Sequence, residues 1–129
     1  MRKIKADICI IGGGAAGLSM AAGAAKMGAN TVLFEAGKMG GDCLNYGCIP
    51  SKTLIANAKT AFHAQNLKKK SVLISSKPTI DFDLISKDIS NIIDKIAPHD
   101  SRERFEKLGV KVIGETAKFT GRHQVSSET

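Results

Sequence analysis

The chain has 129 residues and a formal net charge of +7; 43% of the residues are hydrophobic, 24% charged and 5% aromatic. This composition fits a soluble globular chain and excludes disordered and collagen-like classes, and the length excludes a complete two-domain enzyme. Three cysteines are too few for a disulfide-stapled secreted scaffold, and no apolar run reaches the roughly 18 residues that a membrane-spanning helix needs.

The positive charge is spread along the chain. Residues 1–65 carry a net +4 and residues 66–129 a net +3, with acidic residues mixed among the basic ones. The one compact basic run, residues 68–70, contains no aromatic side chain, so it is typical of a solvated turn. We therefore expect no nucleic-acid binding.

The N-terminus imitates a secretory signal, because basic residues precede an apolar stretch. Asp7 and three consecutive glycines interrupt that stretch, and each glycine costs about 1 kcal/mol in a helix interior. A βαβ unit explains the same residues better. Residues 8–11 suit a strand buried on both faces of a parallel sheet, residues 15–27 suit a helix that Gly28 closes, and residues 31–34 suit a second strand.

A phosphate-binding loop is predicted between the first strand and the helix. Residues 12–17 match G-x-G-x-x-G, in which the glycines allow a tight turn, close approach of a pyrophosphate and close helix–strand packing. The helix N-terminus offers N–H groups and partial positive charge to the anion. The predicted contacts are Gly12, Gly14, Ala15, Ala16 and Gly17.

Glu35 ends the second predicted strand, 18 residues after Gly17. A carboxylate in that place can accept hydrogen bonds from a ribose diol, and it disfavours a 2′-phosphate. The pattern therefore predicts FAD or NAD rather than NADP, with Glu35 and the adjacent Ala36 at the ribose.

Two cysteines lie five residues apart in Cys43-Leu-Asn-Tyr-Gly-Cys48-Ile-Pro50. Because proline favours the first turn of a helix, we expect Cys48 at a helix N-terminus, which lowers a thiol pKa, and Cys43 in the loop before it. A redox-active disulfide fits this spacing. Zinc is the main alternative, but the chain has no second cysteine pair, and Cys9 is expected to be a buried, inert strand residue.

Residues 41–52, together with the glycine loop and Glu35, closely resemble the flavin-dependent pyridine-nucleotide disulfide oxidoreductases, in particular dihydrolipoamide dehydrogenase and mercuric reductase. The resemblance implies that Cys48 faces the flavin as the charge-transfer thiolate and that Cys43 is the interchange thiol. Lys52 would lie near the flavin ring and stabilise its anionic reduced form. The resemblance also places Gly41, Asp42, Cys43 and Lys52 in the FAD site.

Asp42 departs from the family pattern, because most members carry threonine there. The resemblance places this residue near the FAD pyrophosphate, where a carboxylate is electrostatically unusual.

The second half is predicted to support the fold. We expect a continuing helix to residue 62, a connector over 68–80, and an amphipathic helix from Phe82 to Ile96 capped by Asp81. Asp100 and Glu103 suggest a capping box, followed by a strand over 110–113. The resemblance places Thr116 and Ala117 beside the adenine of FAD.

The expected fold class is thus α/β: an incomplete Rossmann-like FAD-binding domain with a parallel sheet, helices and a β-hairpin. Its parts are the βαβ unit (1–37), the cysteine loop and helix (38–66), and the connector, helices and hairpin start (67–129). The expected parent is a cytoplasmic, homodimeric FAD enzyme that uses NAD(P)H and the Cys43–Cys48 pair to reduce a disulfide, a lipoamide-type compound or a metal ion. The alternative is a non-catalytic nucleotide-binding fragment.

Overall fold

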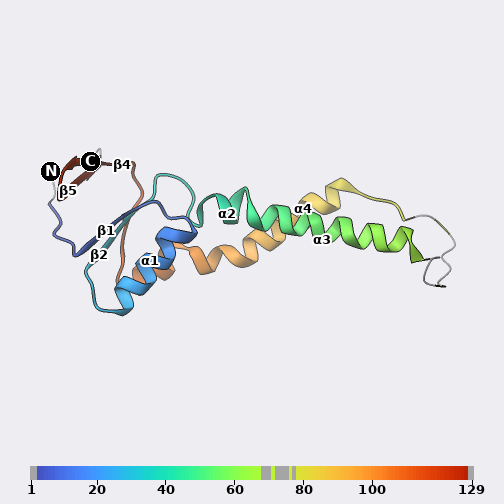
Figure 1. The fold of residues 1–129 in the computed structure, drawn as a ribbon, viewed down its shortest axis with the longest axis horizontal. Coiled ribbons are helices and arrows are strands. Elements are labelled where there is room, and N and C mark those ends of the chain that lie inside the picture. The colour runs from blue at the N-terminus through green and yellow to red at the C-terminus, as the bar shows by residue number, and fades with distance from the viewer. Residues whose placement is uncertain (1–2, 68–70, 72–75, 77, 128–129) are drawn as a thin grey trace.

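The computed structural model describes residues 3–67, 71, 76 and 78–127. The connector expected over residues 68–80 therefore lies largely outside the described residues. The chain folds around a small parallel sheet from which a pair of long helices extends (Figure 1).

The sheet has the order β1-β2-β3, with β1 at Ile8–Ile11, β2 at Thr31–Phe34 and β3 at Lys111–Ile113. All neighbouring strands are parallel. The helix α1 (Ala15–Lys26) follows β1, and Gly28 has the left-handed φ of +84° that the chain needs to leave a helix. The predicted βαβ unit is confirmed.

One face of the sheet packs against α1 and forms the core. Leu33 in β2 is 0% exposed and lies opposite Ile10 and Val112 on the two neighbouring strands. The remaining buried members of the core cluster come from α1 and from the segment before β3: Leu18, Ala21, Phe105 and Val110.

The expectation that β1 is buried on both faces is wrong. Among the described residues β1 pairs with β2 alone, so it is an edge strand, and its exposure alternates along its length. Ile11 is 45% exposed, and Cys9 is exposed rather than buried. In β2, by contrast, all four residues are buried, as its central position requires.

The helices α3 (Cys48–Gln65) and α4 (Phe82–Ile96) pack side by side and run away from the sheet (Figure 1). Asp81 caps α4, as predicted, by accepting from the N–H groups of Asp83 and Leu84. None of the α4 residues is buried. No helix in the described part of the chain is both long and apolar enough to cross a bilayer.

The chain returns to the sheet through a 3-10 turn (η2, Ala97–Asp100) and the short helix α5 (Arg102–Lys107). The predicted capping box is wrong, because Ser101 caps α5 by accepting from the N–H of Arg104, while Asp100 belongs to the preceding turn. After β3, the antiparallel strands β4 (Ala117–Gly121) and β5 (Gln124–Ser127) form the expected hairpin.

Candidate nucleotide and dithiol site

The carboxyl ends of all three parallel strands meet at one edge of the sheet. The N–H of Gly12, just after β1, donates to the carbonyl of Phe34 at 2.8 Å, and the N–H of Glu35, just after β2, donates to the carbonyl of Ile113 at 2.9 Å. Open α/β sheets bind their ligands at this edge.

The glycine loop has the geometry that the motif predicts. Gly12 has a φ of +106°, and a Cβ atom on Gly17 would lie 1.9 Å from the carbonyl oxygen of Gly12, so no larger residue fits there. The N-cap of α1 is Gly14, which offers no side-chain acceptor, and the first turn contains no acidic residue. Ala15 and Ala16 are exposed at this end. The loop therefore fits a pyrophosphate.

The Glu35 carboxylate holds the glycine loop in place. One oxygen accepts the N–H of Gly13 at 2.5 Å, and the other accepts the N–H of Gly37 at 2.6 Å. The sequence placed Glu35 at the ribose but did not indicate these two bonds. Because a carboxylate has about four lone-pair sites, it can hold the loop and still accept from a ribose hydroxyl.

A second glycine turn joins the cysteine segment to this loop. The N–H of Gly40 donates to the Gly13 carbonyl at 2.8 Å, and Gly40 also forms a β-bridge with Gly14. Gly40 and Gly41 have φ values of +87° and +58°, and a Cβ atom on Gly41 would lie 2.7 Å from Gly14 Cα. The two predicted motifs are therefore one continuous structure.

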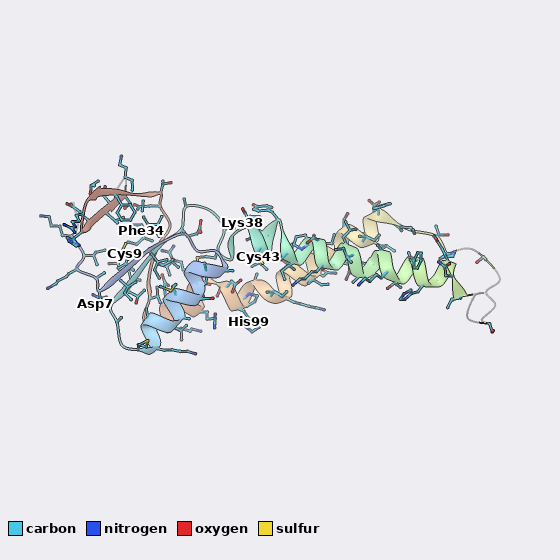
Figure 2. The ribbon with its side chains drawn as sticks, viewed as in Figure 1. Asp7, Cys9, Phe34, Lys38, Cys43 and His99 are labelled. Atoms are coloured by element: carbon cyan, nitrogen blue, oxygen red, sulfur yellow. The ribbon has the colours of Figure 1, made fainter. Side chains whose placement is uncertain are left out.

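Cys43 lies in the five-residue helix α2 (Gly41–Asn45), not in a loop as expected. Two contacts stabilise this helix. The Leu44 side chain is buried, and the N–H of Tyr46 donates to the carbonyl of Asp42, one turn earlier, at 2.9 Å. Cys48 is the first residue of α3, as predicted. The sheet with α1 and α5 packed on it is called the sheet body, and α3 with α4 the helical pair. Figure 2 shows Cys43 where the sheet body meets the helical pair, away from Cys9 on β1.

The Cys48 thiol affects the pKa of the Cys43 thiol. Hydrogen bonding with the Cys48 thiol is the main cause that raises the pKa of the Cys43 thiol, and partial desolvation and repulsion from Cys48 add to it. The backbone N–H of Cys48 and the ammonium of Lys52 act in the opposite direction and lower the pKa. The structure thus brings the three predicted catalytic residues together.

The other predicted residues lie on, or a few residues after, the elements described above. Asp42 is exposed on α2 beside the glycine turn, and Ala36 is exposed just after Glu35. Thr116 and Ala117 follow β3 by a few residues. Cys9 is exposed, although partial burial raises the pKa of its thiol. Among the described residues, no three His, Cys, Asp or Glu side chains are placed to hold a metal ion.

Sequence reasoning missed Asn45 and Lys38. The Asn45 amide donates to the carbonyls of Met39 and Gly41, and the Lys38 ammonium lies 5.7 Å from the centre of the exposed Tyr46 ring. No sequence signal marks Lys38. An asparagine near glycines is typical of a turn or cap, but that pattern does not predict a side-chain amide that donates to carbonyls four and six residues earlier in the chain.

Three comparisons with known proteins agree. The family model for pyridine nucleotide-disulphide oxidoreductases matches residues 6–129. A dihydrolipoyl dehydrogenase of Buchnera aphidicola subsp. Acyrthosiphon pisum is 44% identical over 96 residues, which are 74% of this chain and 20% of that protein. A mercuric reductase of Streptomyces lividans is 29% identical over 113 residues, covering 88% of this chain and 24% of that protein.

Among solved structures, a Cu(II) complex of the HOCl-induced flavoprotein disulfide reductase RclA from Escherichia coli matches with a TM-score of 0.73 and 25% identity. The match covers 94% of this chain and 24% of that one, so the chain spans about a quarter of its relatives' length. The matched family consists of enzymes that use FAD and NAD(P)H. With the glycine loop and the cysteine pair joined as one structure, these matches show that the chain belongs to the pyridine nucleotide-disulphide oxidoreductase family.

Proposed function

We propose that this chain is the nucleotide-binding and dithiol-bearing part of an FAD-dependent disulfide oxidoreductase. The observation that carries the proposal is the placement of Cys43 in α2 and Cys48 at the start of α3, with α2 joined to the glycine loop through Gly40. The Cys48 thiol also raises the pKa of the Cys43 thiol, and the Lys52 ammonium lowers it. The family alone does not assign these roles to individual residues; the geometry supports the assignment.

The cofactor site would be shared between the two glycine turns and the strand end. The loop at residues 12–17 and the first turn of α1 would hold the pyrophosphate, with Glu35 and Ala36 at the ribose, and Gly41 and Asp42 alongside. Thr116 and Ala117 would lie by the adenine. Bound FAD would supply electrons that originate from NAD(P)H.

The two thiols would carry out the exchange with substrate. Cys43 loses its proton, and its thiolate attacks one sulfur of the substrate disulfide, so that a mixed disulfide forms and the first substrate thiolate leaves. Cys48 then loses its proton and attacks the Cys43 sulfur, which releases the second substrate thiolate and leaves a Cys43–Cys48 disulfide. The two departing thiolates carry two electrons, and Lys52 favours the Cys43 thiolate electrostatically.

The test is disulfide formation in the chain itself. After oxidation with oxidised dithiothreitol, the wild-type chain and the control Cys9→Ser should each lose two hydrogen atoms, and peptide mapping should locate the bond at Cys43–Cys48. Cys43→Ser and Cys48→Ser should form no internal bond. A bond to Cys9 would contradict the proposal, as would a pair that stays reduced.

A nucleotide-binding role without turnover is the second candidate, and the chain's small share of its relatives' length favours it for these 129 residues alone. We expect nucleotide binding without NADH oxidation by the isolated chain. Purified chain with a bound yellow flavin and NADH-dependent thiol formation would overturn this second candidate. The cytoplasmic location, the homodimer and the disulfide, lipoamide-type or metal-ion substrate are proposed for the parent enzyme.

A further inference from the structure

Asn45 connects the two ends of α2. Its side-chain amide donates to the carbonyl of Met39 at 3.1 Å and to that of Gly41 at 2.8 Å, on either side of Gly40. The contact is partly buried, and it reaches back from the last residue of α2 to the turn that begins the helix.

A second contact makes α2 and this turn a single unit. Leu44 is 3% exposed, and its side chain packs so closely on Gly40 that a Cβ atom there would lie 2.4 Å from Leu44 Cδ2. The Gly40–Gly41 turn in turn touches Gly13 and Gly14 through a hydrogen bond, a β-bridge and direct backbone packing. A movement of α2 is therefore transmitted to the glycine loop.

The two cysteines lie on opposite sides of a junction. Cys43 is inside α2, whereas Cys48 begins α3 beyond the α2 C-cap at Tyr46. A disulfide, formed when the two thiols give up two protons and two electrons to an oxidant such as oxidised dithiothreitol, fixes α2 against α3. Two thiols impose no covalent restraint between α2 and α3. The redox state of the pair thus acts on the helix that Asn45 joins to the loop.

We propose that Asn45 is a positioning residue that couples the redox state of the Cys43–Cys48 pair to the nucleotide affinity of the glycine loop. This inference rests on the proposed function, since it needs both a nucleotide at the loop and a disulfide between the two cysteines. By linkage, nucleotide must shift the dithiol–disulfide equilibrium by the same factor by which the disulfide changes nucleotide affinity.

ADP is the probe, because it carries the adenosine and pyrophosphate of a dinucleotide. Its Kd is measured by calorimetry for the chain held reduced and for the chain held oxidised, and the dithiol–disulfide equilibrium is measured in dithiothreitol buffers with and without ADP. The two Kd values should differ by at least about fivefold, the lower end of ordinary site coupling. The equilibrium should shift by the same ratio.

In Asn45→Ala the ratio of the two Kd values should fall to near one while ADP still binds. Asn45→Ser, which keeps one donor, should give an intermediate ratio and serves if the alanine variant does not fold. The matched control is Asn57→Ala, which removes an exposed amide bonded to Asp88 on the helical pair and should keep the wild-type ratio.

Equal ADP affinity in the two wild-type redox states would overturn the coupling while leaving the proposed function intact. A wild-type ratio that persists in Asn45→Ala would overturn the role of Asn45. Failure of ADP to bind in either state, or failure of the disulfide to form, would overturn this inference and the proposed function together.

Discussion

Glu35 joins the strand end, the glycine loop and the predicted ribose site in a single side chain. Its two oxygens accept the N–H groups of Gly13 and Gly37. These bonds restrain the glycine loop, and a restrained loop loses less entropy on binding. We therefore propose that Glu35 acts on nucleotide affinity in two ways, through the loop and through the ribose.

Replacing Glu35 with glutamine should separate these effects. Glutamine keeps one acceptor but turns an NH₂ group toward one of the two backbone N–H groups, so one charge-assisted bond is lost. We expect the free energy of unfolding to fall by about 1–3 kcal/mol, the cost of an unsatisfied donor, together with weaker ADP binding. Urea denaturation and calorimetry measure the two effects.

Glu106→Gln is the matched control. Its carboxylate makes an ion pair with Arg102 on the surface, with the two side chains 49% and 48% exposed, and such pairs contribute about 0–1 kcal/mol. A Glu35→Gln variant as stable as this control would show that the carboxylate does not brace the loop.

Cys43 should titrate above the ordinary range of a cysteine thiol, about 8.5, because hydrogen bonding with Cys48 is the main cause that raises its pKa. Alkylation of Cys43 by iodoacetamide, followed site by site with mass spectrometry, should therefore reach half its maximal rate at a higher pH. Cys48→Ala should lower that midpoint, and Lys52→Met should raise it, since the Lys52 ammonium lowers the pKa.

The same shift has a consequence for stability. Between the pKa of the unfolded chain and the higher pKa of the folded one, the folded state holds more protons, so stability falls as pH rises through this interval. A midpoint that rises in Cys48→Ala, or stability that increases with pH across the interval, would contradict the assignment.

At the scale of single residues, the sequence predicted which residues form the glycine loop and the cysteine segment better than it predicted their hydrogen-bond partners. Gly12, Gly17 and the Cys43–Cys48 pair follow from spacing, because glycine conformations and thiol chemistry depend on residue type. The bonds from Gly13 to Glu35 and from Asn45 to Met39 depend on where a turn returns in space. Local patterns do not contain that information.

At the scale of elements, local signals predicted some helix ends and missed another. Gly28 follows the end of α1 and Asp81 begins α4 as their residue types predict, whereas Asp100 and Glu103 do not form the expected capping box, because Ser101 caps α5. Other wrong predictions concern features that depend on neighbouring elements. Cys9 was expected to be buried because β1 is apolar, yet the burial of a strand residue depends on which elements cover the strand, and Cys9 is exposed. Likewise the segment expected to be a loop forms α2, in which Leu44 is buried and packs against Gly40.

The Asp81 cap provides a test at this scale. Its carboxylate accepts from the N–H groups of Asp83 at 2.9 Å and Leu84 at 3.2 Å, and no α4 residue is buried, so packing contributes little to the start of this helix. Asp81→Ala should therefore cost about 1 kcal/mol and accelerate hydrogen exchange in the first turn of α4. Asp94→Ala, in the exposed helix interior, should leave that exchange unchanged. Equal exchange in both variants would exclude the cap.

At the scale of the whole molecule, the stabilising contacts are unevenly distributed. The core cluster lies entirely in the sheet body, where α1, β2, β3 and α5 meet. The helical pair that extends from it carries exposed apolar side chains on both helices, among them Leu54, Ile55 and Phe62 on α3 and Leu84 on α4. Stability should therefore depend on the sheet body far more than on the pair.

Two phenylalanines test this division. Phe105 on α5 is 1% exposed and closes the core beneath the sheet, whereas Phe62 on α3 is 63% exposed. Phe105→Ala should cost about 3–5 kcal/mol through lost burial and the cavity left behind, which is a large part of the roughly 5–15 kcal/mol that holds a domain together. Phe62→Ala should change the free energy of unfolding by no more than about 0.5 kcal/mol.

Urea denaturation followed by circular dichroism compares both variants with the wild-type chain. If the helical pair carried a comparable share of the stability, the Phe62→Ala midpoint would fall as far as that of Phe105→Ala. The expected contrast means instead that the nucleotide edge rests on the well-packed body. Cys43 and Cys48 lie at the junction between this body and the less tightly packed pair, and the buried Leu44 of α2 attaches the Cys43 side of that junction to the body.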